Sequence, residues 1–262
     1  MTAAREKLAR FYRGTEGEAV AVRLIDLAEQ AVRSRKFRVS DFLDPFGMEI
    51  AETVAANFDG ISVTFDGGYP GAERQRAAFV HQDFGGAPSF DVAVVRAEWP
   101  AEFARLTHRD VLGALMGLGV ERDAIGDILV SSGVARVLTG AKMAEFLLTE
   151  WSSIGAARVR VEADSAEAIA PREERTKEIS ATVASLRADS VAAAGFGVSR
   201  SRAASDIEAE KLKLNWQPVK SAAQTVKEGD VLSMRGRGRV EVVEVRGKTK
   251  KGRIGVSLRR YL

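Results

Sequence analysis

The order of short apolar segments between residues 86 and 178 constrains the fold of this chain more than any other feature. Runs of alternating β-branched residues are typical of strands, whereas apolar residues three or four positions apart are typical of helices. The segments follow one another as strand 90–97, helix 107–120, a hairpin of two strands in 126–139, helix 141–153 and strand 157–163. This β-α-β-β-α-β order predicts a ferredoxin-like middle domain in an α+β chain.

RNA-recognition motifs share this order, and they stack bases on aromatic side chains of their central strands. The corresponding strands here, in 90–97 and 126–139, offer Val, Ala and Arg and carry no Tyr or Phe in their middle. We therefore expect residues 86–178 to form a scaffold or docking domain and not a base-stacking platform.

An N-terminal α/β domain is expected at residues 1–85. Residues 17–36 have the apolar periodicity of a helix, and a second helix is predicted to begin after Asp44, because Asp is a good N-cap and Pro45 suits the first helical position. The sequence GISVTFDGG at 60–68 predicts a short strand that ends in a glycine-rich turn.

The C-terminal domain, residues 181–262, is predicted to contain two short helices at 181–194 and 200–210, followed by a small twisted sheet. Residues 163–186 are expected to form a charged connector before it. From residue 180 to the end there are 17 Lys and Arg but 8 Asp and Glu, a charge of +9, so the rest carries −6 of the net +3. A basic module on an acidic body indicates binding to a polyanion, with nucleic acid as the first choice and a merely solvated basic surface as the alternative.

Composition also excludes several classes of site. The absence of cysteine rules out disulfides, thiolate metal sites and cysteine nucleophiles. With only His81 and His108, a histidine-based metal cluster is not expected, although carboxylate metal sites stay open. We predict neither a metal nor another cofactor. The N-terminus lacks a signal-peptide-like apolar core and no run of about 18 apolar residues occurs, so we expect a cytoplasmic protein without direct membrane contact.

The triplets His-Arg-Asp at 108–110 and Asp-Phe-Gly at 83–85 look like protein-kinase signatures. Their order along the chain is the reverse of that in kinases, and the metal-binding Asn that should follow the first triplet is missing. Thr107 and Asp110 instead have the spacing of a helix capping box. Capping and turn formation are the favoured roles, and acid–base catalysis stays open as an alternative, for Asp110, Asp123 and Asp127.

The strongest functional signal is the predicted helix start at Ser199, which is a good N-cap. Arg200 and Arg202 lie in the first turn of this helix, where cations oppose the helix dipole. A bound phosphate would reverse that penalty, because it pairs with both arginines and accepts hydrogen bonds from the free N–H groups of the helix start.

Two further basic segments support this interpretation. In KLKLN at 211–215, strand alternation would put Lys211, Lys213 and Asn215 on one face, although an ordinary amphipathic strand would look the same. In RGRGR at 235–239, the three arginines would share a face if the segment is extended. The candidate RNA-binding residues are Arg187, Ser199, Arg200, Ser201, Arg202, Lys211, Lys213, Asn215, Lys220, Arg235, Arg237 and Arg239.

Residues 185–238 resemble the RNA-binding domain type of ribosomal protein S4, also called the alpha-L motif. The matching motifs are SRSRA at 199–203, KLKLN at 211–215 and VKEGDVLSMRG at 226–236. The chain departs from the pattern at Glu210, where the family often has Gly before the strand. The resemblance implies an S4-type RNA-binding domain at the C-terminus.

Motifs elsewhere resemble the bacterial YlmH family, namely DFLDP at 41–45, GGYPGAERQRA at 67–77, LTHRDVLGALMGLGVERDAIGDILV at 106–130 and KKGRIGVSLRRYL at 250–262. This resemblance implies a non-enzymatic, ribosome-associated RNA-binding protein that helps to rescue stalled large subunits carrying peptidyl-tRNA. It implies ribosomal RNA and the large subunit as partners, tRNA nearby, and a monomer.

Two other classes stay as alternatives. S4-type domains also accompany RNA-modifying enzymes, but LRADSVAAAG at 186–195 has Arg187 and Asp189 without the remaining pseudouridine-synthase motif, and no glycine-rich loop of a methyltransferase follows a strand. A cell-division-linked adaptor is the third class. The sequence does not identify the RNA helix that is bound, and it leaves open whether His108 and Arg109 contact RNA.

Overall fold

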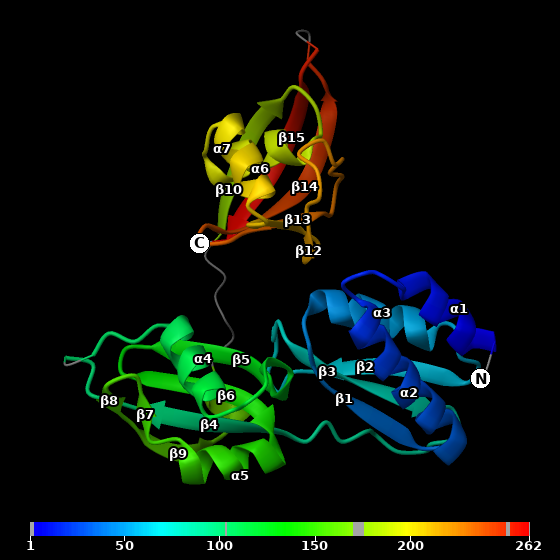
Figure 1. Cartoon of the computed structure of the whole chain (residues 1–262), viewed down its shortest axis with the longest axis vertical. Helices are drawn as coiled ribbons and strands as arrows, with labels where there is room; N and C mark the ends of the chain where they lie inside the picture. The colour runs from blue at the N-terminus through cyan, green and yellow to red at the C-terminus, as the bar shows by residue number, and fades with distance from the viewer. Residues whose placement is uncertain (1–2, 103, 170–175, 250–251, 262) are drawn as a thin grey trace. The chain divides into compact units, whose positions relative to one another are not determined.

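The chain forms two compact units, Met1–Pro171 and Arg172–Leu262. This computed structural model describes residues 3–102, 104–169, 176–249 and 252–261 (Figure 1). The first unit contains the N-terminal and middle segments, and the second contains the basic segment.

The N-terminal part of the first unit is a three-stranded antiparallel sheet packed against helices. Its elements are α1 (Ala3–Tyr12), α2 (Glu18–Ser34), β1 (Phe37–Leu43), α3 (Pro45–Ala55), β2 (Ile61–Asp66) and β3 (Gln75–His81), with strand order β1-β3-β2. The expected strand in 60–68 is β2, whereas α1, β1 and β3 were not predicted.

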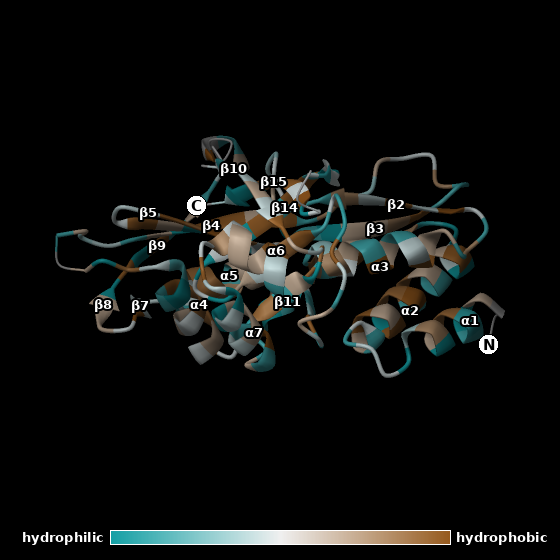
Figure 2. Ribbon diagram, turned by 90° about the horizontal axis from the view of Figure 1, so that it is seen from above, coloured by the Kyte–Doolittle hydropathy of each residue, from teal (hydrophilic) through white to brown (hydrophobic). Residues whose placement is uncertain are grey.

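The two predicted helices of this part are present for the expected reasons. Leu24, Ala28 and Ala31 of α2 are fully or almost fully buried in the core shared with the sheet. Asp44 caps α3 by accepting a hydrogen bond of 2.9 Å from the backbone N–H of Gly47. Figure 2 shows hydrophobic and hydrophilic residues following one another within α2 and α3, as expected of helices that cover a sheet.

The middle segment has the predicted ferredoxin-like fold. Its main elements are β4 (Val92–Glu98), α4 (His108–Gly117), β5 (Ile125–Ser131), β6 (Val134–Gly140), α5 (Ala141–Glu150) and β9 (Arg160–Asp164). The sheet order is β5-β6-β4-β9, and all neighbouring strands are antiparallel. Short 3-10 turns (Arg122–Ala124, Ala166–Ala168) precede β5 and follow β9, and a small hairpin of β7 (Ser153–Ile154) and β8 (Ala157–Arg158) lies between α5 and β9.

One face of this sheet packs on α4 and α5, and the opposite face offers no aromatic platform. On that opposite face, Val94 and Leu138 of the central strands are buried in a cluster with Tyr69 from the loop between β2 and β3. Arg96 of β4 and Arg136 of β6 are engaged there by carboxylates of β9, at 2.7 Å in each case. On the sheet face where RNA-recognition motifs stack bases, the loop between β2 and β3 therefore covers one part, and carboxylates pair with the arginines of another part. The scaffold role of this domain stays a prediction.

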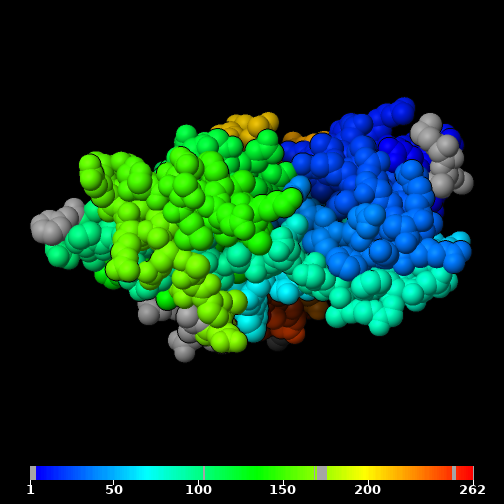
Figure 3. Space-filling model, turned by 90° about the horizontal axis from the view of Figure 1, so that it is seen from below, coloured from blue at the N-terminus to red at the C-terminus, as the bar shows by residue number. Residues whose placement is uncertain are grey.

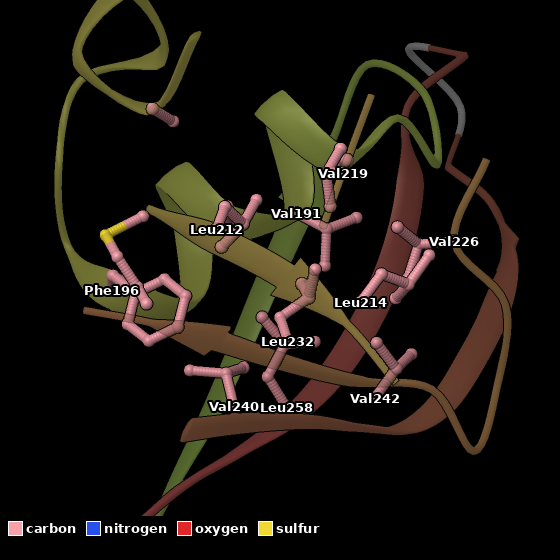
Figure 4. Close-up of a cluster of buried hydrophobic side chains, with 14 of the residues drawn as sticks. Val191, Phe196, Leu212, Leu214, Val219, Val226, Leu232, Val240, Val242 and Leu258 are labelled. Atoms are coloured by element: carbon pink, nitrogen blue, oxygen red, sulfur yellow. The ribbon is translucent and has the colours of Figure 1, made fainter. Parts of the chain in front are cut away.

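The C-terminal unit is a six-stranded antiparallel sheet with two helices on one face. Its elements are β10 (Thr176–Val183), α6 (Ala188–Phe196), α7 (Arg200–Glu208), β11 (Leu212–Leu214), β12 (Gln217–Pro218), β13 (Val231–Met234), β14 (Gly238–Lys248) and β15 (Ile254–Tyr261). The strand order is β10-β15-β14-β13-β11-β12. Figure 4 shows the core, in which Val191 and Phe196 of α6 pack on strand residues such as Leu212, Leu232 and Val240.

Three sequence predictions for this unit need correction. The helix expected at 181–194 begins only at Ala188, because residues up to Val183 end strand β10, which pairs with β15 along its whole length. The C-terminal sheet thus begins within the segment expected to be a connector. Ile179, Ala181 and Val183 alternate along β10 and pack in the core, but the charged residues around them make this strand pattern hard to recognise in the sequence. The second helix ends at Glu208 instead of residue 210.

Glu210 has a left-handed backbone conformation, with a φ of 53°. This is the position where the S4-type pattern often has Gly, and Gly adopts such a φ without steric cost. We expect Glu210→Gly to stabilise the C-terminal unit by about 0.5–1 kcal/mol, since relief of the left-handed conformation outweighs the added freedom of the unfolded chain. Urea unfolding of the full chain measures it.

Glu208→Gly is the matched control, because Glu208 is the last residue of α7 and has helical geometry. That change should destabilise the unit by about 0.5–1 kcal/mol. Equal losses of stability in both variants would contradict the proposed strain at Glu210.

Candidate nucleic-acid interface

The starts of α6 and α7 meet at one buried carboxylate, that of Asp189. Arg187, the N-cap residue of α6, donates to it from Nε at 3.2 Å and from Nη2 at 3.1 Å. Arg200, the first residue of α7, donates from Nε to Asp189 Oδ2 at 3.0 Å. Two arginines that lie 13 positions apart in the sequence are therefore held on one carboxylate.

A second buried carboxylate, Asp206 in α7, holds another pair of cations. Arg202 donates to it from Nε at 3.1 Å, and the Nζ atom of Lys211 lies at 3.4 Å. The side chains of Asp189 and Asp206 are both only 5% exposed, whereas those of Arg200 and Arg202 are 53% and 58% exposed. Four cations share two carboxylates, so this cluster keeps a net charge of +2.

Both carboxylates stay ionised at neutral pH. Burial opposes ionisation of Asp189, but the hydrogen bonds from Arg187 and Arg200 outweigh it, so the pKa of Asp189 is lowered. Burial also opposes ionisation of Asp206, but the hydrogen bonds from Arg202 and Lys211 outweigh it, so the pKa of Asp206 is lowered as well. The two carboxylates thus offset part of the repulsion between the arginines at the start of α7 and the positive end of the helix dipole.

The terminal Nη atoms of Arg200 and Arg202 are not the atoms that contact the two carboxylates. Each arginine reaches its carboxylate through Nε, and within the described residues neither makes a hydrogen bond through its Nη atoms. Ser199 is the predicted N-cap, since its Oγ accepts the N–H of Arg202 at 3.1 Å, and it lies 3.0 Å from Ser201 Oγ. An arginine held at Nε keeps the four N–H bonds of its two Nη atoms for an anion.

The RGRGR segment does not form the expected extended face. Met234 pairs with Gly238, so residues 235–237 are the turn of a hairpin between β13 and β14. Gly236 and Gly238 have φ values of +81° and +85°, which explains the two glycines. The N–H of Arg235 donates to the carbonyl of Lys211 at 2.9 Å, which places this turn beside the cluster around Asp206.

The residues of KLKLN do not share one face either. Lys211 contacts Asp206, whereas Asn215 has a left-handed φ of 47° and donates from Nδ2 to Asp230 at 2.9 Å. Lys213 is exposed on the face of the sheet that carries no helices. It pairs with Ser233 of β13, and Ser233 pairs in turn with Arg239 of β14.

On that face the guanidinium of Arg239 lies 5.0 Å from the centre of the Tyr261 ring. Lys220 is exposed in the connection that follows β12. Most of the predicted RNA-binding residues therefore lie at the helix starts and the hairpin turn, whereas Lys213 and Arg239 lie on the helix-free face.

Three residues that contact the helix starts or the hairpin turn were not among the predicted RNA-binding residues. Asp189 and Asp206 position the cations, and Arg260 of β15 donates to the carbonyl of Phe196, at the end of α6, at 3.3 Å. Arg260 also reaches the carbonyl of Arg237 in the hairpin turn, at 3.4 Å. The spacing of Arg202 and Asp206, four residues apart in a helix, was a visible signal.

The three carboxylates considered for acid–base catalysis have separate contacts. Asp110 completes the capping box of α4 with Thr107, and its pKa is lowered chiefly by the hydrogen bond from the Thr107 hydroxyl. Asp123 forms an ion pair of 2.8 Å with Arg23. Asp127 accepts three hydrogen bonds from the loop between β2 and β3.

A half-buried arginine joins the N-terminal and middle parts of the first unit. Arg74 donates from Nε to the carbonyl of Ile125 at 3.0 Å and from Nη2 to that of Phe42 at 2.8 Å. Burial, followed by the charge of Arg74, lowers the pKa of nearby Arg122 to about 10. Figure 3 shows the blue and cyan N-terminal residues in contact with the green residues of the middle segment.

Within the described residues, no group of three or more His, Asp or Glu side chains is arranged to hold a metal ion. No described helix is long and apolar enough to cross a membrane.

Three family models match the chain in succession. They are described as "YlmH, N-terminal" (residues 16–84), "Putative RNA-binding domain in YlmH" (87–168) and "S4 domain" (186–232). A curated relative, the ribosome-associated protein quality control protein P2 of Bacillus subtilis, is 33% identical over 227 residues, which cover 86% of this chain and 88% of the relative. The chain belongs to the YlmH family. The predicted family and the C-terminal S4 domain are thereby confirmed.

A solved structure of the family has the same type of fold. The cell division protein YlmH from Streptococcus pneumoniae matches with a TM-score of 0.50 at 21% identity, covering 59% of this chain and 95% of that one. One family model is described as a "putative RNA-binding domain" and another as the S4 domain, and the relative's name associates it with ribosomes and protein quality control.

Proposed function

We propose that this protein is a non-enzymatic, cytoplasmic RNA-binding protein that docks on ribosomal RNA of the large subunit and assists the rescue of stalled complexes carrying peptidyl-tRNA. It acts as a monomer through its S4 domain. The ribosome-associated name of the Bacillus subtilis relative and the family models support this proposal.

The arrangement of Arg200 and Arg202 carries the proposal. Both are exposed at the start of α7, both are held at Nε by buried carboxylates, and neither makes a hydrogen bond through its Nη atoms within the described residues. A phosphate accepts paired hydrogen bonds from such a group and is also favoured by the positive end of the helix. Helical RNA hides its base edges in a deep groove, so recognition through phosphates and shape suits this surface.

An RNA-modifying enzyme remains the second candidate because S4-type domains accompany such enzymes. Asp189, the only Asp in the segment compared with the pseudouridine-synthase motif, is buried and bonded to two arginines. That arrangement favours a structural role over attack on a base. Mass spectrometry of ribosomal RNA incubated with the protein should show no mass change.

Binding to large-subunit ribosomal RNA is expected to weaken by about 100-fold between roughly 50 and 200 mM salt, because about four phosphate contacts release counterions. Filter-binding titrations of the full chain at several salt concentrations measure this dependence. Affinity that stays flat across the series would contradict an interface built on phosphates.

A further inference from the structure

The exposed arginines at the start of α7 are each anchored by a carboxylate that is itself almost completely buried. Asp189 binds the Nε atom of Arg200 at 3.0 Å, and Asp206 binds that of Arg202 at 3.1 Å. We propose that Asp189 and Asp206 are positioning residues for RNA, which fix the direction of the two guanidinium groups before RNA arrives. This role rests on the function proposed above.

Fixing the arginines in advance reduces the entropy that binding costs. A free Arg side chain has many rotamers and loses most of them when it clamps a phosphate. Here the bond at Nε restricts the side chain already, and the Nη pair, which makes no hydrogen bond within the described residues, keeps the planar geometry that fits two phosphate oxygens. The aspartates therefore favour binding although they carry the same charge sign as RNA.

The second cation on each carboxylate strengthens the argument. Arg187 shares Asp189 with Arg200, and Lys211 shares Asp206 with Arg202. Each carboxylate thus organises two cations and still leaves a net charge of +1 at its site. The arrangement fixes geometry without cancelling the attraction for phosphate.

Other cations of the same unit differ in this respect. Within the described residues, Lys213, Arg235 and Arg237 have exposed side chains that make no hydrogen bond or ion pair to a carboxylate. Cations without a carboxylate partner attract RNA over a distance and release counterions, but no carboxylate fixes their geometry. The domain thus combines anchored and unanchored cations.

Replacing either aspartate by asparagine separates positioning from simple electrostatics. Asp189→Asn and Asp206→Asn each remove one negative charge, so electrostatics alone predicts equal or tighter binding to RNA. Positioning predicts binding that is about fivefold weaker, with an unchanged slope of affinity against salt because no cation is lost. Filter binding of the full chain to purified large-subunit ribosomal RNA distinguishes the two.

The charge-matched control is Glu208→Gln, which removes an exposed carboxylate of α7. It should bind RNA as tightly as the unmodified protein or slightly more tightly. If Asp189→Asn and Asp206→Asn bind like Glu208→Gln, the positioning role is overturned.

NMR of the arginine Nε–H groups tests the same role without RNA and without depending on how well a variant folds. In the unmodified chain, the Nε–H signals of Arg200 and Arg202 should be distinct and slow to exchange with water. Averaged, rapidly exchanging signals would overturn the proposal. If these signals are distinct but the unmodified protein does not bind the RNA, the proposed function fails while the anchoring of the arginines stands.

Discussion

Replacing Arg200 and Arg202 together by alanine is expected to weaken binding to large-subunit ribosomal RNA by about 100-fold at moderate salt. A hydrogen bond to a charged group contributes about 1.5 kcal/mol or more, so loss of two such contacts gives about 3 kcal/mol, or two orders of magnitude. The slope of log affinity against log salt should fall by about 2, because two phosphate contacts are lost. Filter-binding titrations at several salt concentrations provide both numbers.

The control for this prediction removes the same charge elsewhere. Arg10 and Arg13 are exposed in the first unit, and Arg10→Ala with Arg13→Ala should change the affinity by less than about twofold. Equal losses in the two double variants would show that net charge alone drives binding. Circular dichroism melting checks that both variants remain folded.

Replacing Asp127 by alanine is expected to destabilise the first unit by about 3 kcal/mol. The carboxylate accepts hydrogen bonds from the Tyr69 hydroxyl at 2.7 Å, the Glu73 N–H at 2.8 Å and the Arg74 N–H at 3.0 Å. Alanine leaves these partly buried donors without their acceptor and releases the loop that covers the middle sheet.

Urea unfolding followed by tryptophan fluorescence measures this loss, since Trp99 and Trp151 are buried in the core of the middle domain. Asp123→Ala is the matched control, because the ion pair between Asp123 and Arg23 is partly exposed and should contribute less than about 1 kcal/mol. A larger effect at Asp123 than at Asp127 would contradict these structural roles.

Features decided by a few neighbouring residues could be predicted from the sequence. The caps at Asp44, Thr107 and Ser199 all formed, because a cap depends on side-chain chemistry within one helical turn. The ferredoxin-like domain was predictable for a related reason, since its strands and helices alternate clearly along the chain.

Features that depend on distant residues could not be predicted in this way. Nothing in the sequence pairs Arg200 with Asp189, because their contact requires α6 and α7 to pack first. The alternation in RGRGR was compatible with a strand, but pairing of β13 with β14 makes it a turn. The candidates at the helix starts consequently lie apart from Lys213 and Arg239, which are on the helix-free face.

Two of the sequence motifs that resemble the YlmH family, at 67–77 and 106–130, contact each other in the first unit. Arg74 of the 67–77 block contacts the backbone of the 106–130 block, and Asp127 of the latter block holds the loop of the former. These residues join the N-terminal and middle parts, so the resemblance there reflects the fold. His108 and Arg109 are exposed at the start of α4, and contact with RNA at these residues stays untested.

Ultraviolet crosslinking in living cells, with sequencing of the attached RNA and mass spectrometry of the attached peptides, tests the central claim most directly. We predict that most adducts come from large-subunit ribosomal RNA, and that the crosslinked peptides lie between residues 187 and 239. Adducts spread over messenger RNA, or peptides confined to the first unit, would contradict docking on the large subunit through the S4 domain.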